Sequence, residues 1–543
     1  MILIDFAIVL ALAIYFAAWI LRRLPGRAWV LLGAATILVA VSAWAYTINR
    51  WQVQIAIAVG LGYLALALFT LLKNGRASNV TFYISSVVLV FAAAGSLYPI
   101  FAFPIGSLPT PSGPHQVGTR SFELVDNSRL NVQNAGADAA RRLLIKVWYP
   151  AQVQTCERAP YFTPLEANTT ARSLGVFFGR PELLTHLRHV QTNSCKDAKL
   201  LPLDSAAPPH PTIFYSHGYV MFAGQHVSLM EELASHGYII YAIQHTRDSS
   251  TTVFPNGDIV EMDPRIFNAP EDKGLEDALD LAYSGQTYDA RLDGLLIAAE
   301  SWLESPDRFA KSRKIWVEDR LFVHNKLAAG NAPKSVLDIV GASDFSKTGQ
   351  MGMSYGGSTT GAICLVDKRC AAAVNLDGFD YHLKAINVGI PVPFLMLHAD
   401  TDMFYASSNK TRPAIGHSFN DFSYERFDGV GLSKNVRRIE LRGAFHLGMS
   451  DLPLFLRGPM RDEFVGSTPK GHFVQAQNRL IRDFFDTHLR GQDVGYPDAA
   501  LKAHDGWLHI IDNAAIRTWW QEKPEDERRS LEQRITRILT SEN

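Results

Sequence analysis

The sequence predicts an α/β protein in which four transmembrane helices precede a mostly parallel sheet with helices on both faces. Four long apolar runs occupy the first 105 residues. Short strand-like runs then alternate with helical stretches, and this alternation is typical of a parallel sheet covered on both faces. A Gly-x-Ser-x-Gly motif lies between one of these strand-like runs and the next helical stretch.

The N-terminal region, residues 1–105, is expected to cross a membrane four times. Each apolar run has about 20 residues, the length that crosses about 30 Å of hydrocarbon. One such run alone could be a buried helix or a cleaved signal peptide, but a signal peptide would not be followed by three more runs. The runs are Ile2–Leu21, Ala28–Ile48, Val53–Leu72 and Val80–Phe103.

The polar breaks between the runs predict the orientation of this region. Leu21–Arg27 contains three basic residues and Lys73–Arg76 contains two, whereas Asn49–Gln52 contains only Arg50. The positive-inside rule places the more basic breaks in the cytoplasm. The N-terminus and everything after the fourth run are therefore expected outside, with the lipid bilayer as a partner.

Charge and cysteine content narrow the interpretation of the remaining chain. It has no basic patch of the kind that binds nucleic acid and no Cys/His cluster of the kind that binds metal, so no nucleic-acid partner, metal or cofactor is expected. All four cysteines follow the last apolar run, and an even number in an exported region is compatible with two disulfides. Cys156–Cys195 and Cys364–Cys370 close the shortest loops. Four unrelated buried thiols are the alternative.

After residue 105 we expect a Pro/Gly-rich linker at 106–119, an α/β domain at 120–515 and a charged helical tail at 516–543. Residues 151–200 are interpreted as irregular or loosely helical. Strands are expected at Arg120–Val125, Leu143–Trp148, Thr212–Tyr215, Tyr238–Ile243, Gly349–Met353, Ala371–Leu376, Val392–Leu397 and Asn435–Leu441. Helices are expected at Val227–Ser235, about Ser284–Glu304, Ser358–Ala362, Val474–Leu489 and in the tail from Lys523.

Residues 352–356, Gly-Met-Ser-Tyr-Gly, are typical of a nucleophile elbow centred on Ser354. Such an elbow holds a serine on a tight strand-to-helix turn, which needs small residues at both Gly positions. The motif alone has low specificity in a long chain. The serine also needs a base to take its proton and an acid to orient that base. In α/β-hydrolase folds, the acid and then the histidine follow the serine along the chain.

His446 is the predicted base. It lies in the loop after the strand expected at Asn435–Leu441, and a late loop after a strand is where this fold presents its histidine. His398 lies at the end of an apolar run, so a structural role is favoured for it. His472 and His488 lie on or beside the last helix of the domain.

The acid has two candidates, Asp377 and Asp402. Each follows an expected strand, and the carboxyl ends of parallel strands are where catalytic groups gather. Many folds of this type take the acid from the later position, which slightly favours Asp402. Either residue could instead be a loop-capping aspartate.

The backbone N–H groups of Tyr219 and Tyr355 are the predicted oxyanion donors. Tyr355 follows the nucleophile, and Tyr219 ends the segment Ser216-His217-Gly218-Tyr219 after an early strand. Gly218 has no side chain, so the backbone there can approach a substrate. A plain turn at His217-Gly218 is the alternative. Loss of one such donor costs roughly 3 to 4 kcal/mol of transition-state stabilisation.

These segments resemble the plasma-type platelet-activating factor acetylhydrolase family, Ca²⁺-independent serine esterases of the α/β-hydrolase fold. The matching segments are Phe214–Gly218, Leu233–Tyr238, Gly352–Gly357, Asn375–Gly378 and Leu441–His446, and Leu108–Pro114 and Val147–Pro150 resemble bacterial members. In the family the acid directly follows the strand after the elbow helix. The resemblance therefore implies Asp377 as the acid, and it implies the same two oxyanion donors.

The resemblance implies a membrane-anchored bacterial serine esterase whose catalytic domain is periplasmic or extracellular. Its expected substrates are short or oxidised acyl esters of phospholipids, or related small esters. A dienelactone-hydrolase-like or polyester-cleaving enzyme is an alternative, and a non-catalytic sensor or binding head is another. Met353 replaces a histidine common in the family, and Asp248–Asp272 is expected to form a lid or substrate wall.

Overall fold

The computed structural model describes residues 3–72, 79–130, 140–203, 207–267, 272–305, 308–379, 390–417, 419–422, 435–467, 472–512 and 514–541. Two compact units make up the chain. The first contains Met1–Ser107, Pro160–Gln191 and Leu454–Glu463, and the second contains Leu108–Ala159, Thr192–Pro453 and Phe464–Asn543. The units interleave along the sequence, whereas the predicted division was linear.

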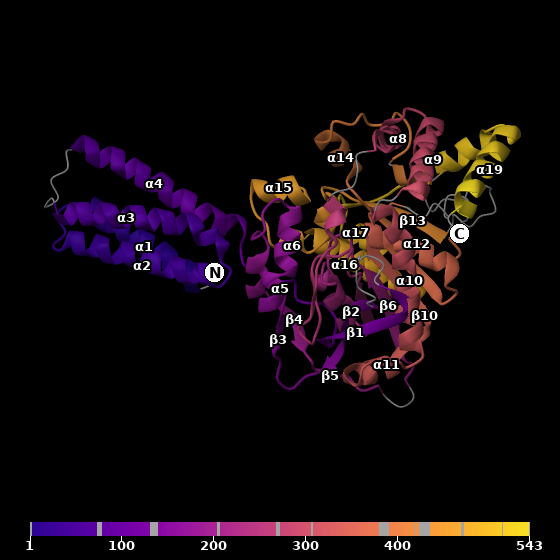
Figure 1. Ribbon diagram of the computed structural model, residues 1–543, viewed down its shortest axis with the longest axis horizontal. Coiled ribbons are helices and arrows are strands. Elements are labelled where there is room, and N and C mark those ends of the chain that lie inside the picture. Colours follow the sequence, from indigo (N-terminus) through magenta and orange to yellow (C-terminus); the bar gives the residue numbers. More distant parts are fainter. Residues whose placement is uncertain are drawn as a thin grey trace. The chain divides into compact units, whose positions relative to one another are not determined.

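The first unit contains four helices that are long and apolar enough to cross a membrane. They are α1 (Leu3–Ile20), α2 (Arg27–Thr47), α3 (Gln54–Leu72) and α4 (Asn79–Ala102), each within a few residues of a predicted run (Figure 1). Small residues allow close packing between neighbouring helices. At Gly60 of α3, for example, an added Cβ would lie 2.8 Å from the Val39 side chain of α2.

The loop between α2 and α3 contacts a later segment of the same unit. That segment holds α5 (Pro164–Asn168) and α6 (Thr170–Phe177). His189 contacts the Ile48 carbonyl through Nε2 at 2.7 Å, and the Trp51 indole donates to the Leu183 carbonyl at 3.0 Å. Arg188 also donates to the Asn49 side chain at 2.7 Å. Residues 160–191 therefore lie on the same side of the helix bundle as the α2–α3 loop.

The second unit is built on a 12-stranded sheet with the order β14-β13-β12-β11-β10-β6-β7-β2-β1-β4-β3, and β5 pairs with β2. The strands from β7 through β13 along this path run parallel, and β14, β2 and β1 are antiparallel to their inner neighbours. The strands are β1 (Gln116–Leu130), β2 (Ala140–Gln152), β3 (Arg158–Pro160), β4 (Gln191–Lys196), β5 (Lys199–Leu200), β6 (His210–Ser216), β7 (Ile239–Gln244), β10 (Ser343–Met353), β11 (Cys370–Leu376), β12 (Phe394–Ala399), β13 (Val436–Leu441) and β14 (Leu508–Ile510).

Helices cover both faces of this sheet, as the alternating pattern predicts. On β10, Gly349 faces α16, where an added Cβ would lie 2.8 Å from Phe485, while Gln350 faces α10 and accepts a hydrogen bond from Arg320. Successive residues of a strand point to opposite faces. The helices are α7 (Val227–Ser235), α8 (Lys273–Ser284), α9 (Tyr288–Glu304), α10 (Arg308–Ala328), α11 (Leu337–Gly341), α12 (Tyr355–Val366), α14 (Thr401–Ser407), α15 (Pro459–Val465), α16 (His472–His488), α17 (Asp498–Ala503), α18 (Ala514–Glu522) and α19 (Glu525–Ser541).

Several predicted boundaries were wrong. The linker expected to end at 119 already contains the start of β1, and the tail expected from 516 begins with α18 at Ala514. The helix expected at Ser284–Glu304 corresponds to α9, which begins at Tyr288 because the Thr287 hydroxyl caps it, and α8, which ends before Gly285, was not predicted. Residues 151–200 contain short strands as well as α5 and α6.

The helix α10 was not predicted at all. Its buried face carries charged and polar side chains, among them Arg308, Asp319, Arg320 and His324. The apolar periodicity that identifies an amphipathic helix is therefore weak in this segment. Buried charges of this face have partners on the sheet. The residues that weaken the apolar periodicity of α10 therefore also fix its position.

Both predicted disulfides are confirmed. Cys156 is bonded to Cys195, and Cys364 is bonded to Cys370. The first bond joins the segment after β2 to β4, and the second joins the end of α12 to the start of β11.

Candidate active site

The predicted nucleophile lies where the strand order of the sheet reverses. The chain runs from β6 to β7, which pairs with one edge of β6, and later returns as β10, which pairs with the other edge. A crevice forms at such a switch point, at the carboxyl ends of the strands. Ser216, the last residue of β6, pairs with Gly352 of β10, so Ser354 and the loop after Ser216 are neighbours there.

Ser354 occupies a strained turn between β10 and α12. Its φ is 53° and its ψ is −118°, a conformation that residues with a side chain rarely adopt. The flanking glycines are required by close packing of the backbone. A Cβ at Gly352 would lie 2.1 Å from the Gly356 carbonyl oxygen, and one at Gly356 would lie 2.1 Å from the Ser216 carbonyl oxygen. These contacts explain why the motif needs Gly at both positions.

Asp377 and His446 meet beside this turn. The distance from His446 Nδ1 to Asp377 Oδ2 is 2.6 Å. The neutral ring donates through Nδ1, which leaves Nε2 as a proton acceptor. Asp377 follows β11 with a φ of 52°, and its other oxygen accepts the Ala399 N–H at 2.9 Å.

Burial alone would raise the pKa of Asp377. The hydrogen bond from His446, the charge of that ring when protonated and the Ala399 N–H more than offset burial, so the pKa lies below its usual range. Asp377 is therefore a carboxylate at neutral pH, as an orienting acid must be.

Asn375 holds the turn that presents Asp377, a role that sequence reasoning missed. Its side chain accepts the Gly378 N–H at 2.7 Å and donates to the Gly378 carbonyl at 3.0 Å. The same side chain lies against the elbow, because a Cβ at Gly357 would be 2.1 Å from Asn375 Oδ1. The turn and the elbow are thus built against one another.

Asp402 lies elsewhere. It is in the first turn of α14, its side chain is 67% exposed, and its ion-pair partner is Arg412. It lines a second, polar cavity of about 340 Å³, together with Arg438 and Glu440. Of the two acids considered from the sequence, Asp377 is the one that the structure brings to His446.

The loop after β6 lies against the nucleophile. A Cβ at Gly218 would be 3.4 Å from Ser354 Cβ, so the backbone there approaches the elbow closely. The Gly218 N–H donates to Gln225 Oε1 at 2.9 Å, and the rings of Tyr219 and Tyr355 lie 5.1 Å apart. The residues whose N–H groups were predicted as oxyanion donors are thus neighbours across the site.

A cavity of about 380 Å³ contains Ser354, Asp377 and His446 together. Its volume is at the lower end of the range for small-molecule sites. In the part of the chain that the structure describes, six aromatic side chains line it: Tyr283, Phe379, Phe404, Tyr405, Phe445 and Phe464. Sequence reasoning missed them, because they come from elements far apart in the chain and share no motif.

The segment Asp248–Asp272 does not supply a wall of this cavity in its described part, 248–267 and Asp272. Its hairpin pairs β8 (Thr252–Val253) with β9 (Ile259–Val260). The carboxylate of Asp248 is buried and accepts hydrogen bonds from Arg308 and Trp316 at 2.6 Å and 2.9 Å. Asp248 is therefore a structural anchor for α10. Among the described residues, no cluster of His, Cys, Asp and Glu could hold a metal ion.

Comparisons with known proteins bear on the fold and on the class of reaction. The model of the family "Platelet-activating factor acetylhydrolase, isoform II" matches residues 102–264, which include the loop after β6. A probable 1-alkyl-2-acetylglycerophosphocholine esterase of Arthroderma benhamiae is 24% identical over 417 residues, covering 72% of this chain and 89% of that protein. A ferulic acid esterase from Streptomyces cinnamoneus has a similar structure, with a TM-score of 0.51 and 21% identity over 75% of this chain and 100% of that one. The sheet order and this structural likeness are those of an α/β-hydrolase fold.

Proposed function

We propose that this chain is a serine esterase that works through an acyl-enzyme. The observation that carries the proposal is the hydrogen bond between His446 and Asp377, 2.6 Å long, in the same cavity as Ser354 on its strained turn. Nucleophile, base and acid follow one another along the chain in the order that this fold uses. The relative from Arthroderma benhamiae, a probable esterase, supports the same chemistry.

In the proposed mechanism Ser354 Oγ attacks the ester carbonyl while His446 Nε2 takes its proton. Asp377 holds the ring and stabilises the imidazolium that forms. The protonated ring then gives its proton to the leaving alcohol, and the acyl group stays on Ser354. A water molecule then gives a proton to His446 and attacks the acyl-enzyme. The carboxylic acid leaves, and His446 returns the proton to Ser354 Oγ, which restores the hydroxyl.

The developing oxyanion is held by the backbone N–H groups of Tyr219 and Tyr355. Tyr355 is the first residue of α12, where the unsatisfied N–H groups of a helix N-terminus favour negative charge. Gly218 brings the other donor close, since its backbone lies against Ser354. Each donor is worth roughly 3 to 4 kcal/mol in the transition state.

The proposed substrates are esters of short or oxidised acyl chains on phospholipids, or related small esters. A cavity of about 380 Å³ accommodates a small group, and none of the described residues that line it is a Lys or an Arg. A phosphate in the substrate would therefore lie outside this cavity, with the acyl ester at Ser354. The Arthroderma benhamiae relative, a probable 1-alkyl-2-acetylglycerophosphocholine esterase, is consistent with such a substrate.

Esters of aromatic acids, including polyesters, are the second candidate. The six aromatic side chains that line the cavity favour a planar ring, since aromatic groups stack on one another. A dienelactone-type substrate would use the same cavity.

The proposed location is the membrane of a bacterial cell, with the catalytic domain on the outside. Four apolar helices and the basic breaks between them support this orientation. The contacts between the α2–α3 loop and residues 160–191 support it as well, because they place both segments on one side of the bundle. Two disulfides fit an oxidising compartment.

Labelling with a fluorophosphonate probe tests the proposal. The full chain in detergent or nanodiscs is expected to react at Ser354, and Ser354→Ala is expected to lose both labelling and ester hydrolysis. A folded wild-type chain that neither reacts with the probe nor hydrolyses any ester would favour a non-catalytic binding head. The substrate class follows from comparing p-nitrophenyl esters of short acids, esters of aromatic acids, and vesicles of phospholipids with short acyl chains.

A further inference from the structure

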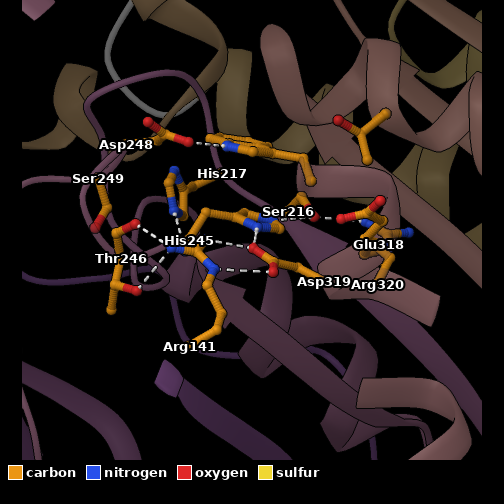
Figure 2. Close-up of polar contacts among 12 residues, drawn as sticks. Arg141, Ser216, His217, His245, Thr246, Asp248, Ser249, Glu318, Asp319 and Arg320 are labelled. Carbon is orange, nitrogen blue, oxygen red and sulfur yellow. Dashed lines mark hydrogen bonds and ion pairs between the residues drawn. The ribbon is translucent and has the colours of Figure 1, made fainter. Parts of the chain in front are cut away.

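A second Ser–His–Asp alignment lies directly behind the predicted oxyanion loop. Ser216 Oγ is 2.9 Å from His245 Nε2, and His245 Nδ1 is 2.9 Å from Asp319 Oδ2. Figure 2 shows the His245 ring hydrogen-bonded to both of the other side chains, and Arg141 donating to the same Asp319 carboxylate. The three residues come from the ends of β6 and β7 and from α10. None of them belongs to the site described above.

This alignment is not a second nucleophilic site. Ser216, His245 and Asp319 are all fully buried. The Ser216 hydroxyl oxygen also accepts a hydrogen bond from Arg320 Nη1 at 2.8 Å, which occupies the approach that a substrate carbonyl would need. Arg320 is held in turn by the carbonyls of Met351 and Phe214 at 3.1 Å and 3.3 Å. These three residues can therefore affect a reaction only through the neighbouring residues that they hold in place.

The hydrogen-bond directions in this alignment are fixed by charge. Burial would raise the pKa of Asp319, but Arg141 and the His245 ring offset it and hold the pKa well below its usual range. Burial lowers the pKa of His245 to about 4, so the ring is neutral at pH 7. Nδ1–H then donates to Asp319, and Nε2 accepts the Ser216 hydroxyl proton.

The chain of hydrogen bonds continues into the oxyanion loop. The backbone N–H of His245 donates to His217 Nε2 at 3.2 Å. With Nε2 as the acceptor, His217 carries its proton on Nδ1 and donates it to the Gly218 carbonyl at 2.6 Å. Burial lowers the pKa of His217 to about 3, which keeps this tautomer neutral.

The Gly218 carbonyl belongs to the same peptide unit as the Tyr219 N–H. In a trans peptide the C=O and the N–H point in opposite directions. The hydrogen bonds that hold the carbonyl, from His217 Nδ1 and from the Met221 N–H at 3.0 Å, therefore set the direction of the predicted oxyanion donor. Gly218 lies between this peptide and the elbow, with its Cα against Ser354.

We propose that Ser216, His245 and Asp319, acting through His217, form a positioning relay that aligns the Tyr219 N–H with the oxyanion. The inference rests on the proposed esterase function and deepens it. His217 is the positioning residue that touches the peptide. The His245 N–H holds the His217 ring, and Ser216 and Asp319 hold the His245 ring. Trp316 packs on this arrangement, with its ring stacked on His245 at 3.9 Å and edge-on to His217 at 5.0 Å. A preorganised donor saves reorganisation in the transition state.

The test compares His217→Phe with His217→Asn in the full chain. Phe fills the space but cannot donate, whereas the Asn amide can place a donor near the position of Nδ1. For His217→Phe we expect kcat to fall about 10- to 100-fold with KM within about twofold, because the lost alignment acts in the transition state. The inhibition constant of a trifluoromethyl ketone, whose adduct with Ser354 carries an oxyanion, should weaken by the same factor. His217→Asn should recover most of both losses.

The outcomes separate the relay from the esterase proposal. A wild-type chain without ester hydrolysis or probe labelling defeats the esterase proposal, whatever the His217 variants do. With an active wild type, the relay is overturned if folded His217→Phe keeps its kcat and its affinity for the inhibitor. It is also overturned if His217→Phe changes KM as much as kcat and His217→Asn restores neither. Should His217→Phe not fold, Ser216→Ala carries the test. It is expected to lower kcat several-fold at unchanged KM, and a wild-type kcat in that variant would overturn the relay.

Discussion

The chain holds two Ser–His–Asp alignments, one open and one sealed. In the open one, Ser354–His446–Asp377, the side chain of His446 is 44% exposed and that of Asp377 is 19% exposed. In the sealed one, Ser216–His245–Asp319, the His and Asp side chains are both 0% exposed. The residue types and the His–Asp hydrogen bond are the same. Access to a substrate and the presence of buried arginines around the acid therefore decide which alignment can do chemistry.

The backbone at the serine separates the two alignments as well. Ser354 sits on a turn with positive φ at the start of α12, which lifts its hydroxyl into the cavity. Ser216 ends β6 in regular strand geometry, and its hydroxyl points at Arg320 and His245. A serine beside a neutral histidine is thus not enough for a nucleophile, because the turn that exposes it is also needed.

The largest expected effect comes from the acid of the open alignment. Asp377→Asn should lower kcat about 10³- to 10⁴-fold, because the amide favours the wrong tautomer of His446. Asp402→Asn is the matched control, since that carboxylate is exposed and pairs with Arg412 outside this cavity. Its kcat should stay within about twofold of wild type. Steady-state hydrolysis of a p-nitrophenyl ester measures both, and a large loss only in Asp402→Asn would make Asp402 the acid.

Asp319, the acid of the sealed alignment, is expected to contribute to the stability of the fold. Asp319 faces Arg141 at 2.6 Å and Arg129 at 2.9 Å. Asp319→Asn leaves the buried Arg141 charge without its partner, which costs about 3 to 5 kcal/mol. Asp338→Asn is the control, because its pair with Arg120 is 46% exposed on the acid side and worth at most about 1 kcal/mol.

Thermal denaturation measures this contrast. Asp319→Asn should unfold at a markedly lower temperature than wild type, and Asp338→Asn should unfold within a few degrees of it. Equal midpoints for Asp319→Asn and wild type would mean that the buried ion pair adds nothing to the stability of the fold.

Sequence reasoning reached the open alignment and missed the sealed one, for a physical reason. Ser354 lies in a motif whose glycines are required, because a Cβ at Gly352 or Gly356 would lie 2.1 Å from a backbone carbonyl oxygen. His446 and Asp377 each follow a strand with clear apolar character. Such signals are local. Asp319 lies on α10, whose buried polar face gives no apolar period. Its contacts with His245 span 74 positions of sequence, and no spacing rule connects them.

The cavity, too, combines features that local sequence signals predict with features that depend on contacts between distant segments. Eight strands of the large sheet, both disulfides and the four long apolar helices follow from length, periodicity and loop size, which are properties of short segments. The aromatic lining depends on where α8 and α14 pack over the sheet, and α8 was itself not predicted. Ser354, Asp377 and His446, which share the cavity, were therefore predictable, whereas its aromatic lining was not.

The smallest expected effect is the pH dependence of stability, which the sealed region should dominate. Burial lowers the pKa of His217 to about 3 and those of His226 and His245 to about 4. In the unfolded chain the same rings titrate near 6.5. Between about pH 6.5 and pH 4 the unfolded state therefore binds more protons, and stability falls as the pH is lowered. Asp451 opposes this trend, because burial raises its pKa to about 7 and the folded state takes up a proton there first.

Among these four groups, three against one leave a net loss of stability in acid, of about 2 to 3 kcal/mol per pH unit at most. Burial also lowers the pKa of His186 to about 3, which adds to the loss, and it raises the pKa values of Glu231 and Asp248, which oppose it. Calorimetry of the full chain should show a midpoint that drops between pH 6.5 and pH 4.5. Asp451→Asn removes the opposing group, so its midpoint should drop more steeply over the same range, while at pH 8 it should equal or exceed that of wild type. A midpoint that stays level in both proteins would mean that these buried rings take up protons without unfolding.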